Sequence, residues 1–142
     1  MKIKLIVIIG LIVVLSITCL SLFFTLKNNN EEDIVENIRA YCKKNKQIKL
    51  SEITKFDWDT AYIDNQHYGY GEEIKEEYGL IGEFENLYSD NLLRIAFCKD
   101  KKLVKDVICS VFLLYFDNSV KIIKPETILM VEWDSNSLKL LE

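Results

Sequence analysis

An unbroken apolar run near the N-terminus most strongly constrains what this chain can fold into. It extends from Leu5 to Leu26 without a charged residue and has lysines on both sides. At a helical rise of about 1.5 Å per residue, its 22 residues reach roughly 33 Å, enough to cross a hydrocarbon core about 30 Å thick. The run predicts a transmembrane anchor, residues 1–27, so the lipid bilayer is the expected partner of residues 5–26.

A cleaved signal peptide is the alternative interpretation of this run. The apolar part of a signal peptide usually has about 7–15 residues, whereas this run continues past Phe24. Cys19 is the candidate for lipidation, but a lipoprotein signal has a leucine three residues earlier and a small residue directly before the cysteine. This chain has Ser16 and Thr18 at those positions. We therefore expect an uncleaved anchor and keep lipidation of Cys19 as the alternative.

The flanking charges predict the orientation of the anchor. Lys2, Lys4 and the α-amino group precede the run, whereas Lys27 is followed by the asparagines and acidic residues of the segment 28–33. Because the more basic flank of a membrane helix stays in the cytoplasm, we expect a single-pass membrane protein with residues 28–142 outside the cell membrane.

The part after the anchor is acidic and has the size of one domain. Its 115 residues include 15 basic and 22 acidic side chains, a net charge of −7 compared with −4 for the whole chain. Such a charge argues against nucleic acid as a partner and against binding to anionic lipid. It suits a cationic protein or peptide partner, or serves solubility alone.

The three cysteines after the anchor are Cys42, Cys98 and Cys109. If Cys98 and Cys109 lie on the two strands of one hairpin, they are about six strand residues apart, near 20 Å, beyond the reach of a disulfide. We expect buried free thiols, and a bridge from Cys42 to either of the others stays open.

The first half of the domain predicts two helices and one strand. Acidic residues open a helix over 31–45 and lysines close it, with one apolar stripe made of Ile34, Val35, Ile38, Tyr41 and Cys42. A strand follows over 56–63, in which Phe56, Trp58, Thr60 and Tyr62 share the face expected to point to the core. Residues 64–71 have loop composition, and residues 72–78 predict a short helix that ends at Gly79.

The second half predicts strands separated by short polar turns, over 92–98, 103–116, 120–123, 128–133 and 138–141. We expect a bulge near Lys105–Asp106, a buried central strand from Val107 to Phe116 and a hairpin turn at Asp117–Asn118. The fold class is α+β: an N-terminal transmembrane helix, then one small domain whose mostly antiparallel sheet comes chiefly from residues 91–141, with both helices packed on one face. A small curled barrel is the alternative.

The chain lacks the motifs that carry the common enzyme chemistries. No serine lies in a nucleophile-elbow motif, and there is no phosphate-binding loop or dinucleotide fingerprint. His67 is the only histidine, which excludes multi-histidine zinc sites. Asp57, Asp59 and Asp64 could together hold Ca²⁺, but their spacing does not match an EF-hand, and the solvated face of a strand explains them better. We expect a protein that is not an enzyme and needs no metal or cofactor.

Tyrosines gather around the loop that contains His67. Exposed tyrosines make rigid, amphipathic contact surface, so Tyr62, His67, Tyr68 and Tyr70 are the candidate binding residues. The alternative is that several of these tyrosines cap the core.

The segment Lys55–Ile63, which reads K-F-D-W-D-T-A-Y-I, is followed by a short helix and then by the strand-like segment Asn91–Asp100. This order resembles a family of small bacterial membrane-anchored proteins and lipoproteins with an F-D-W-D-x-x-Y-I segment, over about residues 50–105. In that family Pro-Tyr usually follows Tyr-Ile, whereas this chain has Asp64–Tyr68 there. The resemblance implies export and a small α+β domain. It implies no activity, because the family has none established.

These observations favour a membrane-anchored, extracytoplasmic binding or interaction module, of the immunity type or associated with the cell envelope. The alternative function is a cell-envelope hydrolase that uses His67 with Asp57, Asp59 or a cysteine.

Overall fold

The computed structural model describes residues 34–65, 71–117, 120–134 and 137–142, all within the compact unit Glu31–Glu142. The predicted transmembrane segment, residues 5–26, lies outside the described residues. Among the residues that are described, no helix is both long enough and apolar enough to span a membrane.

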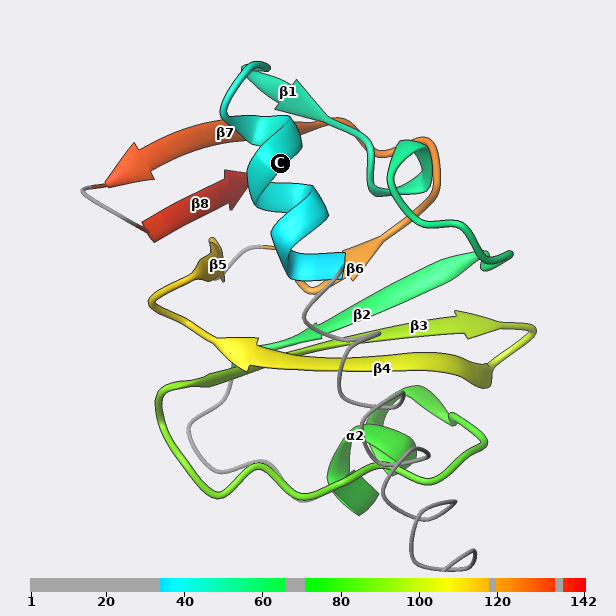
Figure 1. The fold of residues 1–142 in the computed structure, drawn as a ribbon. Coiled ribbons are helices and arrows are strands. Elements are labelled where there is room, and N and C mark those ends of the chain that lie inside the picture. The colour runs from blue at the N-terminus through cyan, green and yellow to red at the C-terminus, as the bar shows by residue number, and fades with distance from the viewer. Residues whose placement is uncertain (1–33, 66–70, 118–119, 135–136) are drawn as a thin grey trace, which may run out of the picture. The chain divides into compact units, whose positions relative to one another are not determined.

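The described part of the chain is an α+β domain with two four-stranded sheets. Figure 1 shows them one above the other. Sheet A has the strand order β1 (Gln47–Ile48), β7 (Leu129–Asp134), β8 (Ser137–Leu141) and β5 (Leu114–Phe116). Sheet B has the order β4 (Lys102–Ser110), β3 (Leu92–Lys99), β2 (Thr60–Asp64) and β6 (Ile122–Ile123). Among these strands β5 and β8 are parallel and the other neighbours are antiparallel, so the predicted mostly antiparallel α+β class is confirmed.

The first helix, residues 34–42, packs its apolar stripe into the larger of two cores. Val35, Ile38 and Cys42 are buried there, as the helical spacing predicts. The same core receives one face of each sheet, through residues such as Leu129 and Leu140 from sheet A and Ile95 and Phe97 from sheet B. The turn η1 (Leu50–Glu52) follows β1 and buries Leu50.

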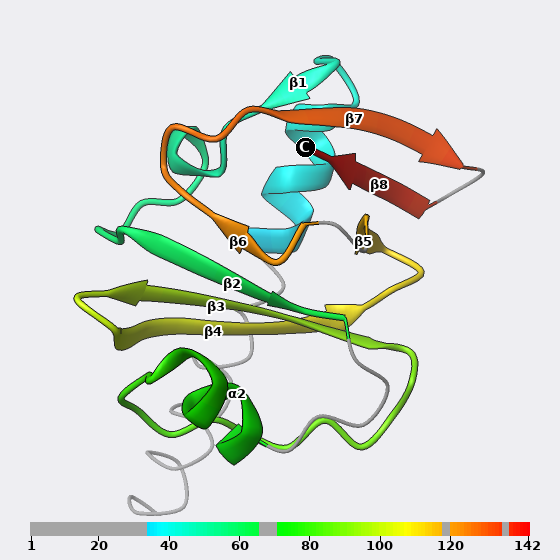
Figure 2. The ribbon, with the colours of Figure 1, turned by 180° about the vertical axis from the view of Figure 1, so that it is seen from behind.

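The second helix, α2 (Gly71–Tyr78), covers the opposite face of sheet B (Figure 2). A smaller core lies between them, made of Tyr62, Ile74, Leu80, Ala96 and Cys98. Strands β2 and β3 are therefore buried on both faces, which explains why β3 reads as a nearly continuous apolar run.

The domain has two sheets and not the single sheet predicted, and three further topological expectations are therefore wrong. The stretch 103–116 is not one central strand, because β4 ends at Ser110, the chain turns over residues 111–113, and β5 joins sheet A. The strands on either side of Asp117 therefore lie in different sheets and form no hairpin. The two helices do not share a face of one sheet, since the first packs between the sheets and α2 on the far face of sheet B.

The aromatic strand also differs from its prediction. β2 begins at Thr60, and Phe56 and Trp58 precede it. Their rings pack edge-to-face on Phe97, with centroids 5.2 and 5.1 Å away. Tyr62 points into the smaller core, so the four residues do not line one face.

The predicted bulge lies close to its expected place. The register of β3 and β4 shifts between Phe97, which faces Lys105, and Cys98, which faces Leu103.

Candidate binding surfaces

The start of α2 is held against the segment that follows the helix. The Gly71 N–H donates to Asn86 Oδ1 at 2.9 Å, which satisfies one of the amides at the helix start. A Cβ atom at Gly71 would lie 2.1 Å from the Phe84 carbonyl oxygen, so only glycine permits this approach. Ile74 is buried one turn later and fixes the helix to sheet B.

Tyr62 lies beneath α2 rather than at the surface. Its side chain is 9% exposed, and its ring centroid is 4.7 Å from that of Tyr78. Burial raises the pKa of Tyr62, and burial together with a hydrogen bond to Glu77 raises the pKa of Tyr78 to about 12. Tyr62 is therefore a core residue, which is the alternative given above for these tyrosines. His67, Tyr68 and Tyr70 lie outside the described residues, so their binding role stays a prediction.

The solvent face of α2 is strongly acidic. Four glutamates of this helix are exposed: Glu72, Glu73, Glu76 and Glu77. Its sequence contains a single basic residue, Lys75, whose Nζ pairs with Glu72 at 2.8 Å. Glu83 and Glu85 are exposed in the next segment. We call the four glutamates of the helix the α2 acidic face. The sequence showed these residues only as parts of a short helix.

A buried arginine on sheet B bonds to the segment that follows α2, and we call its contacts the Arg94 network. Arg94 is 0% exposed, and its Nε donates to both carboxylate oxygens of Asp106, at 3.0 and 3.2 Å. Its Nη1 is 3.9 Å from the Asp64 carboxylate, and its Nη2 donates to the Glu85 carbonyl. The guanidinium also lies over the Phe84 ring, 5.7 Å from the centroid. In the sequence, the signal that could have indicated this network is one arginine inside an otherwise apolar segment.

Two of the three candidate Ca²⁺ carboxylates, Asp57 and Asp59, bond to the β3–β4 hairpin, and the third, Asp64, lies 3.9 Å from Arg94. Asp57 pairs with Lys99, and Asp59 accepts hydrogen bonds from the Asp100 N–H at 2.6 Å and the Thr60 hydroxyl at 2.8 Å. These bonds, the one from Asp100 above all, lower the pKa of Asp59. Across the described residues no group of three or more metal-ligating side chains is found.

The three described cysteines are free and buried, as predicted. Burial raises the pKa of Cys42 and Cys98 to about 11 and that of Cys109 to about 12. The thiols are therefore neutral at physiological pH and poor nucleophiles.

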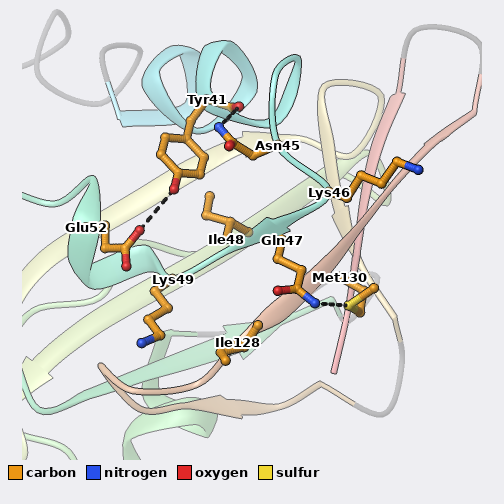
Figure 3. A pocket seen from close by; sticks show the side chains of 9 residues that line it. All are labelled: Tyr41, Asn45, Lys46, Gln47, Ile48, Lys49, Glu52, Ile128 and Met130. Carbon is orange, nitrogen blue, oxygen red and sulfur yellow. Dashed lines mark hydrogen bonds between the residues drawn. The ribbon is translucent and has the colours of Figure 1, made fainter.

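A groove of about 520 Å³ lies along β1 (Figure 3). We call it the β1 groove; it is lined by Tyr41, Asn45, Lys46, Gln47, Ile48, Lys49, Glu52, Ile128 and Met130. The Tyr41 hydroxyl donates to the Glu52 carboxylate at 3.0 Å, and the Gln47 amide nitrogen lies 3.4 Å from the Met130 sulfur. Sequence reasoning missed this site, because its two lining segments are about 80 residues apart in the chain.

Comparison of the chain with protein-family models, curated proteins and solved structures finds no match.

Proposed function

We propose that this protein is a membrane-anchored, extracytoplasmic interaction module, of the immunity type or associated with the cell envelope, whose partner is a cationic protein or peptide. The partner would bind to the α2 acidic face and to the preceding loop with His67, Tyr68 and Tyr70. In this proposal the protein is not an enzyme and uses no cofactor.

The observation that carries the proposal is the concentration of charge on a firmly held helix. The α2 acidic face carries four exposed glutamates, while Gly71, Ile74 and the Arg94 network fix the backbone beneath it. A surface of one charge sign raises the local concentration of oppositely charged partners and speeds their association. The loop that precedes this helix in the sequence contains His67, Tyr68 and Tyr70, and tyrosine side chains suit protein contacts.

The alternative hydrolase is less well supported by the described side chains. A cysteine nucleophile needs a thiolate, and the pKa values of Cys42, Cys98 and Cys109 lie near 11 to 12. Asp57 and Asp59 are engaged by Lys99 and by the β3–β4 turn.

Photo-crosslinking in cells of the source organism tests the proposal. A photo-reactive residue in place of Glu76 should capture a protein or peptide with a basic sequence, because Glu76 is exposed on the α2 acidic face. The additional substitution Glu73→Lys should lower the yield several-fold by repulsion. Raised salt should lower it as well, since exposed charges are screened within about 10 Å at 0.1 M.

The matched control is a photo-reactive residue in place of Glu132, an exposed glutamate on β7 of sheet A. It should capture far less of the same partner. Equal capture at both positions, or a partner with an acidic surface at Glu76, would contradict the proposed function.

A further inference from the structure

The β1 groove lies at an open edge of sheet A. β1 is the terminal strand of the sheet, and its one neighbour there is β7. The Lys46 carbonyl accepts the Val131 N–H at 3.0 Å, and Ile48 pairs with Leu129. Since alternate residues of an antiparallel strand direct their peptide groups to the same side, the N–H and C=O of Gln47 point to the open edge. An extended peptide could pair with them.

Two exposed apolar side chains lie across β1 from this edge, on and next to the neighbouring strand β7. Ile128 is 50% exposed and Met130 is 43% exposed, although both adjoin the well-buried Leu129. Figure 3 shows Met130 beside the Gln47 side chain and Ile128 on the same side of the groove as Lys49. Strand addition joins main-chain hydrogen bonds to contacts with alternate side chains. Met130 lies opposite Gln47, the residue with which an added strand would pair.

The charge around the groove is opposite to that of the domain. Lys46 and Lys49 line it, and Lys43 and Lys44 are exposed just before it, at the end of the first helix. The facing carboxylate, Glu52, accepts a hydrogen bond from Tyr41. Residues 28–142 carry a net charge of −7, so the sign of the charge at this groove is opposite to that of the domain as a whole. Charge complementarity selects an anionic occupant.

We propose that the β1 groove binds an extended acidic segment of a second partner protein as an added strand beside β1. The segment's backbone pairs with Gln47, and its carboxylates contact Lys46 and Lys49. Its side chains on the Gln47 face pack against the Gln47 side chain, which in turn contacts Met130. This interface is separate from the α2 acidic face and selects the opposite charge. An anionic lipid surface offers negative charge as well, but it has no backbone to pair with the strand edge.

The chain provides a specific reporter for this groove, because its two methionines are Met1 and Met130. We would label the methionine methyl groups with ¹³C in the full chain, held in nanodiscs of phosphatidylcholine. The probe is a capped hexapeptide that alternates glutamate and valine. The Met130 signal should shift saturably while the Met1 signal stays in place. A matched hexapeptide of lysine and valine should leave both signals unchanged.

Two variants test the contacts. Lys46→Glu combined with Lys49→Glu should weaken peptide binding about tenfold or more, by removing two attractions and adding two repulsions. Lys101→Glu with Lys102→Glu, which changes the net charge equally at the exposed β3–β4 turn, should bind like the original protein. Gln47→Pro should also weaken binding, because it removes the N–H at the open edge and keeps the carbonyl bonds to β7. An unchanged circular-dichroism spectrum of each variant verifies its fold, because loss of the Gln47 side chain would by itself move the Met130 signal.

Three results would overturn the inference. One is a Met130 signal that does not move with the acidic peptide, and another is an equal shift with the lysine peptide. The third is a Met130 shift produced by phosphatidylglycerol in the nanodisc without any peptide, which would assign the groove to lipid. Each of these leaves the cationic partner of the α2 acidic face untested, so the two proposals fail separately.

Discussion

Arg94 shows how a single buried charge can organise a small domain. Its guanidinium is surrounded by the Asp106 and Asp64 carboxylates, the Glu85 carbonyl and the Phe84 ring. Removing one partner of such a buried pair is costly, because the remaining charge keeps its desolvation cost without compensation. The network therefore fixes the segment over sheet B in one position, which is a requirement for presenting charges on α2 in a defined arrangement.

Trp58 is the residue on which the larger core most visibly depends. It is 6% exposed, packs edge-to-face on Phe97, and its Nε1 donates to the Thr54 hydroxyl at 2.8 Å. Trp58→Ala should lower the free energy of unfolding by about 3–5 kcal/mol, the usual cost of such a cavity. Urea unfolding of the full chain in detergent micelles, followed by the fluorescence of the remaining tryptophan, measures this cost.

Trp133→Ala is the matched control, because Trp133 is 39% exposed and contacts the first helix through the Cys42 carbonyl and Arg39. Its cost should be clearly smaller, about 1 kcal/mol. Equal costs for both tryptophans would mean that the core does not centre on Phe97.

At the scale of elements, the position of α2 depends on the contacts of its first residue, Gly71, with the segment that follows the helix. Gly71 approaches the Phe84 backbone closely, and Asn86 accepts its N–H. The chain after the helix then reaches the edge of sheet B, where the Ile81 N–H donates to the Lys101 carbonyl and the Leu103 N–H donates to the Ile81 carbonyl, both at 2.8 Å. These bonds cover part of the exposed edge of β4 and limit pairing with other chains.

Gly71→Ala should loosen α2, because its new methyl group would overlap the Phe84 carbonyl. Forcing atoms into a well-packed site costs about 1–3 kcal/mol. Hydrogen exchange of the full chain should therefore show faster exchange of the α2 amides, with little change in β7 and β8. Glu73→Ala, an exposed position in the same helix, should leave the exchange within experimental error, and equally fast exchange in both variants would refute the role of the glycine.

At the scale of the whole molecule, the domain carries charges of opposite sign on different sheets. The α2 acidic face covers sheet B, and the lysines of the β1 groove lie at the edge of sheet A (Figure 1). Two partners of opposite charge could therefore bind at once without competing for the same residues.

The apolar run predicts the membrane topology of the chain, and this prediction can be measured directly. Protease added to intact protoplasts should remove the domain and leave a small anchor fragment, because residues 28–142 are expected outside the membrane. A reporter fused after Glu142 should behave as extracytoplasmic. Protection of the domain from the protease would show that the orientation is the opposite of the one predicted. Lipid found on Cys19 by mass spectrometry would show that the protein is a lipoprotein.

Local sequence signals were sufficient for most of the elements. The apolar stripe of residues 34–42 predicted the first helix, Gly79 the end of α2, and the turn residues around 134–137 the β7–β8 hairpin. Burial of Cys42, Cys98 and Cys109 also followed from sequence. These features depend on interactions within a few residues, such as helical spacing, left-handed glycine conformations and hydrogen bonds across a tight turn.

Only the tertiary structure decided which strands distant in the sequence pair, and what the faces of the strands contact. The turn at 111–113 sends β5 to sheet A beside β8, and nothing local in the stretch 103–116 distinguishes that path from one long strand. Because β2 is covered on both faces, its alternation could not show that Tyr62 faces α2. The β1 groove likewise joins residues 41–52 to Ile128 and Met130. Such sites arise from long-range packing, whose free energy depends on partners that are distant in the sequence.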